Sequence, residues 1–178
     1  MKIDSSNYPL ILGRHLIERL ILSFAKILAV SGGLILILMV IVNIISIIGR
    51  VTFGVPLVGD FELIEIACGV SIFMFLPICK LKNGNIIVDA FTVKLDQRKK
   101  VFLDIFSDLV FGIVALFFSY RMIFGLLDMM RYNEQTMLLE IPVWIPFGPA
   151  IFSLFFLSLI CFWSSLNKFQ DLFFVREI

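Results

Sequence analysis

Two acidic residues, Glu62 and Glu65, stand where a polar turn gives way to a long apolar segment. A spacing of three places both carboxylates on one face of a helix, with Gly69 and Ile72 continuing that face inward. A carboxylate near membrane depth is a candidate proton or cation site. The alternative is an ion pair or a partner contact at the membrane boundary. We favour the alternative, because a charge there costs far less than the roughly 2.5 to 3.5 kcal/mol of the bilayer centre.

The nearest cation to these acids is Arg50, which closes the preceding apolar segment. Because all three residues lie at the same boundary, we predict an ion pair between Arg50 and either Glu62 or Glu65. Such a pair at a wet interface is worth no more than roughly 1 kcal/mol. Its effect would be to fix the angle between the first two apolar segments.

Two further groups of charges interrupt the third apolar segment. Asp104 and Asp108 form an i,i+4 pair just after Arg98-Lys99-Lys100, which suggests charge compensation at the cytoplasmic interface, with a transport role for Asp108 as the alternative. The second group follows the segment's apolar centre at roughly helical spacing and suggests a helix that continues beyond the membrane, where it could dock a partner. Its members are Arg121, Asp128, Arg131 and Glu134.

Motifs of enzymes and metal sites do not occur in the sequence. It has no nucleophile elbow, phosphate-binding loop or zinc motif. Cys68, Cys79 and Cys161 lie in apolar segments without CxxC spacing, and His15 is the single histidine. We therefore expect no enzymatic activity, and no cofactor or metal in this chain.

The elements that position the acids are membrane-spanning helices. Hydrophobic residues make up 60% of the 178 residues and charged residues 16%, with a mean hydropathy of +1.04, so the chain cannot cover an ordinary water-soluble surface. About 20 apolar residues in a helix cross the bilayer core. We predict an all-α integral membrane protein with one domain, residues 1–178, and four transmembrane helices, at roughly 27–48, 61–79, 101–127 and 141–167. Trp144 would anchor the start of the fourth helix at the interface.

The basic residues predict the orientation. Twelve lie in the N-terminal tail, the loop between spans two and three, and the C-terminal tail, whereas the other side has only Arg50, Arg121 and Arg131. The positive-inside rule then places both termini in the cytoplasm, in a multi-pass protein of the cell inner membrane. Before the first span, apolar residues recur at helical spacing over 13–26, which predicts an amphipathic helix along the interface. A simple extension of span one is the alternative.

Several loose motifs occur in a specific order. They are the Arg50-x-x-Phe53-Gly54-x-Pro56 turn, the acids that open span two, the run Gly84-Asn85-Ile86-Ile87-Val88-Asp89, and Ile141-Pro142-x-Trp144. In this order the chain resembles the small membrane subunit (DctQ-type) of tripartite ATP-independent periplasmic (TRAP) transporters. Asn85 departs from the family pattern, which commonly has histidine there, so no role can rest on an imidazole. Gly84 and Asp89 still fit a turn that leads into an amphipathic segment.

The resemblance implies a non-catalytic scaffold subunit. Its partners would be a large multi-span subunit that holds the solute and sodium sites, and a periplasmic binding protein that delivers an organic acid. Two other hypotheses stay open. One is a small autonomous proton-coupled transporter that works as an oligomer through Glu65 and Asp108, and the other is a tetraspan assembly protein unrelated to transport. Nothing in the composition indicates nucleic-acid binding.

Overall fold

Four long helices make up the described part of the chain. The computed structural model describes the backbone of residues 8–54, 57–82 and 97–174, and the side chains of 17–54, 57–82 and 101–170. Within these residues the helices are α1 (Tyr8–Phe53), α2 (Asp60–Leu81), α4 (Gln97–Tyr132) and α5 (Phe147–Phe174). Each contains a segment long and apolar enough to cross a membrane. The predicted all-α class with four such helices is confirmed.

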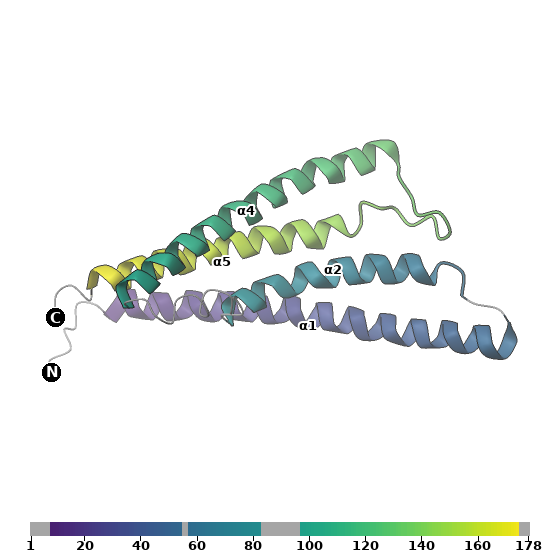
Figure 1. Cartoon of the computed structure of the whole chain (residues 1–178), viewed down its shortest axis with the longest axis horizontal. Coiled ribbons are helices and arrows are strands. Elements are labelled where there is room, and N and C mark those ends of the chain that lie inside the picture. Colours follow the sequence, from purple (N-terminus) through teal and green to yellow (C-terminus); the bar gives the residue numbers. More distant parts are fainter. Residues whose placement is uncertain (1–7, 55–56, 83–96, 175–178) are drawn as a thin grey trace.

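Successive helices run in opposite directions (Figure 1). The end at which α1 begins and α5 finishes is called the terminal end here, and the opposite end is called the turn end. Helix α1 packs on α2, α2 packs on α5, and α5 packs on α4. Of the apolar window of α5, 44% is buried, against 6% for α1 and 17% for α4. The chain's own helices therefore leave most of the surface of α1 and α4 uncovered.

Small residues allow the helices to approach closely. A Cβ at Gly32 would lie 3.2 Å from the Met74 Cβ, and one at Gly112 would lie 3.0 Å from the Cys161 Cβ. The close approach of α1 and α2 at Gly32 also allows the Ser71 hydroxyl to donate a hydrogen bond to the Gly32 carbonyl, at 3.1 Å. In lipid the hydrophobic effect does not drive helices together, so close packing and such interhelical hydrogen bonds hold α1 against α2.

Pro77 lies inside α2, near its end, and is fully buried. Proline has no N–H, so the Phe73 carbonyl one turn earlier loses its intrahelical donor. The Ser153 hydroxyl of α5 donates to that carbonyl instead. The proline thus frees an acceptor that joins α2 to α5, and α2 continues to Leu81 without a break.

The N-terminal segment differs from the favoured prediction. Helix α1 is continuous from Tyr8 to Phe53, so residues 13–26 extend the first span instead of forming a separate interfacial helix. The extension was the alternative interpretation of the same pattern. The apolar residues at helical spacing there continue the apolar surface of the span, and no turn residue separates the two parts.

The fourth helix begins later than predicted. It starts at Phe147, whereas the sequence prediction placed the start of the span at Ile141. Residues 133–146 form a compact loop, closed by hydrogen bonds from the Thr136 N–H to the Ile141 carbonyl and from the Val143 N–H to the Glu134 carbonyl, both 3.0 Å. Pro142 and Pro146 lie within the loop, and proline disfavours the helical conformation of the residue before it.

Candidate functional site

A buried carboxylate joins three helices near the terminal end. Asp108 of α4 is 2% exposed. Its Oδ1 accepts a hydrogen bond from the Lys80 ammonium of α2, and its Oδ2 accepts from the Ser164 hydroxyl (2.8 Å) and the Lys168 ammonium (3.0 Å) of α5. Lys80 also lies over the Phe111 ring, 5.9 Å from its centroid. We call Asp108, Lys80, Ser164 and Lys168 the Asp108 cluster.

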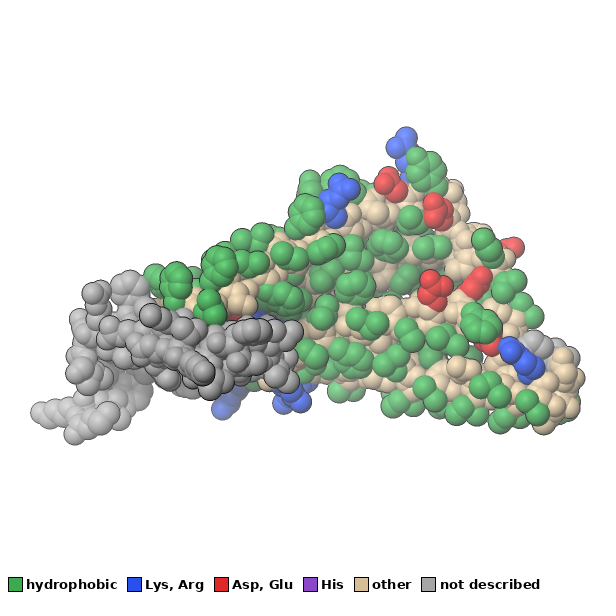
Figure 2. Space-filling model, viewed as in Figure 1, with side chains coloured by type: hydrophobic (Ala, Val, Ile, Leu, Met, Phe, Trp, Pro, Cys, Tyr) green, Lys and Arg blue, Asp and Glu red, His purple; other side chains and the backbone are tan. Residues whose placement is uncertain are grey.

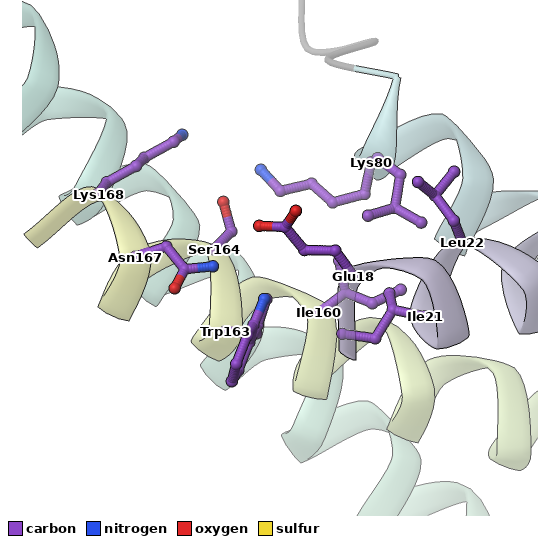
Figure 3. A pocket seen from close by; sticks show the side chains of 10 residues that line it. Glu18, Ile21, Leu22, Lys80, Ile160, Trp163, Ser164, Asn167 and Lys168 are labelled. Carbon is purple, nitrogen blue, oxygen red and sulfur yellow. The ribbon is translucent and has the colours of Figure 1, made fainter. Parts of the chain in front are cut away.

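A cavity of about 340 Å³ lies beside this cluster. Figure 3 shows that Glu18 of α1 reaches the cavity and directs its carboxylate toward the side of Lys80 and Ser164. The buried Trp163 Nε1 also lines the cavity and has no acceptor among the described residues. Glu18 and Asp108 balance Lys80 and Lys168 in charge. Among the described residues, two acids thus lie close to the two lysines that line the cavity.

The sequence predicted that Asp108 has its charge compensated, with Arg98, Lys99 and Lys100 as the neighbouring cations. The side chains of Arg98, Lys99 and Lys100 lie outside the described residues. The described cations that compensate Asp108 are Lys80 and Lys168, which come from neighbouring helices. Both carboxylate oxygens of Asp108 thus accept hydrogen bonds from neighbouring helices, and the group joins α4 to α2 and α5.

At the turn end, the predicted ion pair of Arg50 was wrong in its acid. Arg50 pairs with Asp60, at 3.8 Å, and not with Glu62 or Glu65. The Ser46 hydroxyl also donates to the Asp60 Oδ2, at 2.6 Å. Asp60 is the first residue of α2, so these contacts join the beginning of α2 to the last turns of α1. The ion pair with Asp60 would fix the angle between the first two spans, the effect that we predicted for a pair with Glu62 or Glu65.

Glu62 instead holds the loop of residues 133–146. Its two carboxylate oxygens accept hydrogen bonds from the backbone N–H groups of Leu138 (2.8 Å) and Leu139 (3.0 Å). Hydrogen bonds to a charged acceptor are about twice as strong as those between neutral groups. Glu62 is therefore a positioning residue for the loop.

We expect Glu62→Ala to loosen this loop. Removal of the acceptor breaks two hydrogen bonds to a charged group, worth about 1.5 to 3 kcal/mol when well formed and less where water reaches the amides. The amides of residues 138 and 139 should therefore exchange hydrogen about fivefold faster or more. Hydrogen exchange followed by mass spectrometry measures this rate. Glu65→Ala is the matched control, because Glu65 bonds neither amide. Equal exchange in the two variants would contradict the role of Glu62.

Glu65 lines a second and larger cavity, of about 600 Å³, which we call the turn-end cavity. Its walls come from one face of α2, the end of α4, the loop of residues 133–146 and the start of α5. Glu65 is exposed and forms no hydrogen bond or ion pair with any residue that the structure describes. Glu62, Glu65 and Gly69 of the predicted face line this cavity together. Ile72, the fourth residue of that face, is 62% exposed and is not among the lining residues.

The structure does not bring Glu65 and Asp108 together. Lys80, which binds Asp108, follows Glu65 by fifteen residues on the same helix. At 1.5 Å per residue, Glu65 and Lys80 are about 22 Å apart along α2, and Asp108 lies at the Lys80 end. These two acids therefore cannot form one short proton relay within the chain.

The other candidate residues have varied positions. Arg121 and Arg131 are exposed on α4, which continues to Tyr132. Of the four charged residues predicted on this helix, Glu134 lies past its end, in the loop of residues 133–146. Trp144 is exposed in the loop, and its carbonyl accepts from the Phe147 N–H at 3.2 Å. Gly84 and Asp89 lie outside the described residues. Among the described residues, no group of three or more histidine, cysteine, aspartate or glutamate side chains could hold a metal.

The fold and these contacts define a class of protein, a small multi-pass membrane protein whose buried polar groups join its own helices. The sequence assigns it more closely. Residues 20–171 match the family described as "Tripartite ATP-independent periplasmic transporters, DctQ component", and the chain belongs to this family of transporter small subunits. No curated protein and no solved structure matches the chain. The resemblance drawn from the motif order is thereby confirmed.

Proposed function

We propose that this chain is the non-catalytic scaffold subunit of a sodium-coupled secondary transporter. A large multi-span subunit would hold the solute and sodium sites and move its transport domain against this chain. A periplasmic binding protein would deliver the solute, an organic acid carrying a carboxylate. The solute class and the coupling ion follow from the family resemblance, and the scaffold role also has support in the geometry.

The scaffold role is supported by the hydrogen bonds of the polar groups inside the spans, which join the helices of this chain to one another. Between the two ends, the hydroxyls of Ser71, Ser119 and Ser153 donate to backbone carbonyls of neighbouring helices. A solute carboxylate needs free donors, and a sodium ion needs free oxygen ligands. The described residues of the span interiors supply neither as a group, so these sites are expected in a partner subunit.

The uncovered apolar surfaces of α1 and α4 fit the same role. Only 6% of the apolar window of α1 and 17% of that of α4 is buried within the chain. Such surfaces suit lipid and the apolar helices of a larger subunit equally well. We place the terminal end in the cytoplasm on the positive-inside rule, which puts the loop of residues 133–146 on the side where a binding protein would dock.

Reconstituted uptake tests this proposal. The chain is expressed with a candidate large multi-span subunit of this transporter family, and the two should co-purify through a tag on either one. In liposomes, sodium-driven uptake of an organic acid should need both membrane proteins and the binding protein. Saturable uptake by the purified chain alone would overturn the scaffold role, as would failure of the two membrane proteins to associate.

A further inference from the structure

The turn-end cavity is large enough to hold a small ligand. None of the proposed transport steps uses it. Its volume of about 600 Å³ lies within the range of about 300 to 1,000 Å³ typical of small-molecule pockets. From Glu65 to Phe73 the cavity follows α2 over eight steps of 1.5 Å, or about 12 Å of helix. It therefore extends along α2 from the outer end of the helix inward.

One side of the cavity is open because Gly69 has no side chain. A Cβ built at Gly69 would meet no heavy atom within 4 Å. Phe73 of α2, Met122 of α4 and Phe147 of α5 supply apolar lining around it. This inner part offers contact to an apolar chain and no partner for a second polar group.

The outer part of the turn-end cavity, near Glu65, carries negative charge. Glu65 is exposed and lacks a partner among the described residues, whereas both oxygens of Glu62 are taken up by backbone amides. Acidic side chains gather at the turn end (Figure 2). Within the described residues of this end, six acids face three arginines: Asp60, Glu62, Glu65, Asp128, Glu134 and Glu140 against Arg50, Arg121 and Arg131. An anion is therefore disfavoured here and a cation is favoured.

We propose that the turn-end cavity binds an amphiphile with a protonated amine on an apolar chain. The ammonium group binds the Glu65 carboxylate, and the chain lies along Gly69 toward Phe73. The same chemistry has two sources, a phospholipid with a primary ammonium headgroup and a free long-chain amine. The inference concerns the isolated chain, so it stands independently of the proposed transport partners.

Native mass spectrometry of the full chain in a neutral maltoside detergent tests the charge selectivity. The probes are dodecylammonium, dodecanol and dodecyl sulfate, which share a chain and differ in charge. Dodecylammonium should bind most tightly, and one molecule should remain bound per chain. Equal or tighter binding of dodecyl sulfate would overturn the proposal.

Two variants with matched controls locate the site. Glu65→Gln should weaken dodecylammonium binding about fivefold, the effect expected for one exposed ion pair, while Glu134→Gln, an acid that does not line the cavity, should not. Gly69→Leu should fill the cavity and abolish binding of the amine and the alcohol. Gly33→Leu is its control, since a Cβ there also meets nothing within 4 Å, but on α1. Circular dichroism and thermal unfolding confirm that each variant is folded.

A Gly69→Leu protein that binds the amine as wild type does would overturn the location, and an unchanged Glu65→Gln affinity would overturn the role of the carboxylate. Nanodiscs that contain equal amounts of phosphatidylethanolamine and phosphatidylcholine identify the source. Selective retention of phosphatidylethanolamine, lost in Glu65→Gln, supports the lipid. Binding of dodecylammonium without lipid selectivity supports a free amine.

Discussion

Asp108→Ala should destabilise the folded chain by about 3 to 5 kcal/mol, the effect of breaking a buried ion pair from one side. The variant leaves the Lys80 ammonium, on a side chain that is only 10% exposed, without its acceptor. Lys168 is 34% exposed and can turn its ammonium toward the membrane surface, so most of the loss comes from Lys80. The free energy of unfolding, from denaturant titration in mixed detergent micelles, measures the effect.

Asp104→Ala is the matched control for this prediction. Asp104 is the same residue type one turn earlier on α4, and no described residue forms a hydrogen bond or ion pair with it. Its loss should change the free energy of unfolding by less than about 0.5 kcal/mol. Equal values for the two variants would mean that the Asp108 cluster does not hold the helices together.

A double substitution separates the buried charge from the lost contact. With Asp108→Leu and Lys80→Met together, neither buried charge is left unpaired, and the apolar side chains fill a similar volume. Replacement of a whole buried pair by apolar residues is often neutral, so the double variant should be more stable than Asp108→Ala. A loss equal to the sum of the losses in the single variants Asp108→Leu and Lys80→Met would indicate that the two residues are not coupled.

The four membrane-spanning helices were predictable from sequence because few backbone structures are stable in the hydrocarbon layer of a membrane. Every backbone polar group must be paired inside the hydrocarbon layer, so a long apolar run has to become a helix. That constraint acts on composition and length, which one sequence displays directly. The start of the fourth helix was misplaced because hydropathy continues through Pro142 and Pro146, whereas the helical conformation does not.

The polar contacts were harder to predict, because hydropathy gives the depth of a residue and not the direction of its side chain. Lys80, Asp108 and Lys168 each lie near the terminal end of a span, so their similar depth was visible in the sequence. The rotation of α2, α4 and α5 that brings them together depends on packing, through features such as Gly112 against Cys161. No pattern within one helix carries that information.

The error at Arg50 has a similar geometric cause. Successive residues of an α-helix differ by 100°, so Asp60 and Glu62 point about 200° apart around α2. Because Asp60 faces α1, where Ser46 and Arg50 lie, Glu62 faces the loop of residues 133–146. The prediction recognised the boundary that these groups share, but it chose residues on the wrong face.

Gly59 directly precedes α2 in a left-handed conformation. Gly59→Ala should destabilise the chain by about 2 to 4 kcal/mol, from backbone strain and overpacking together. Gly59 has φ +81°, in the left-handed region that residues with a Cβ rarely adopt. A Cβ there would also overlap the side chain of Leu139. Since the Leu139 N–H binds Glu62, the displaced side chain should pull the loop from its anchor.

Gly54→Ala separates the two contributions, because Gly54 has a similar φ of +69° but a Cβ there would meet nothing within 4 Å. It should lose only the strain of a left-handed alanine, about 1 to 2 kcal/mol. Faster hydrogen exchange of the amides of residues 138 and 139 is expected in Gly59→Ala and not in Gly54→Ala. If both variants showed the same loss and the same exchange, backbone strain alone would explain the effect, and overlap of the added Cβ with Leu139 would not contribute.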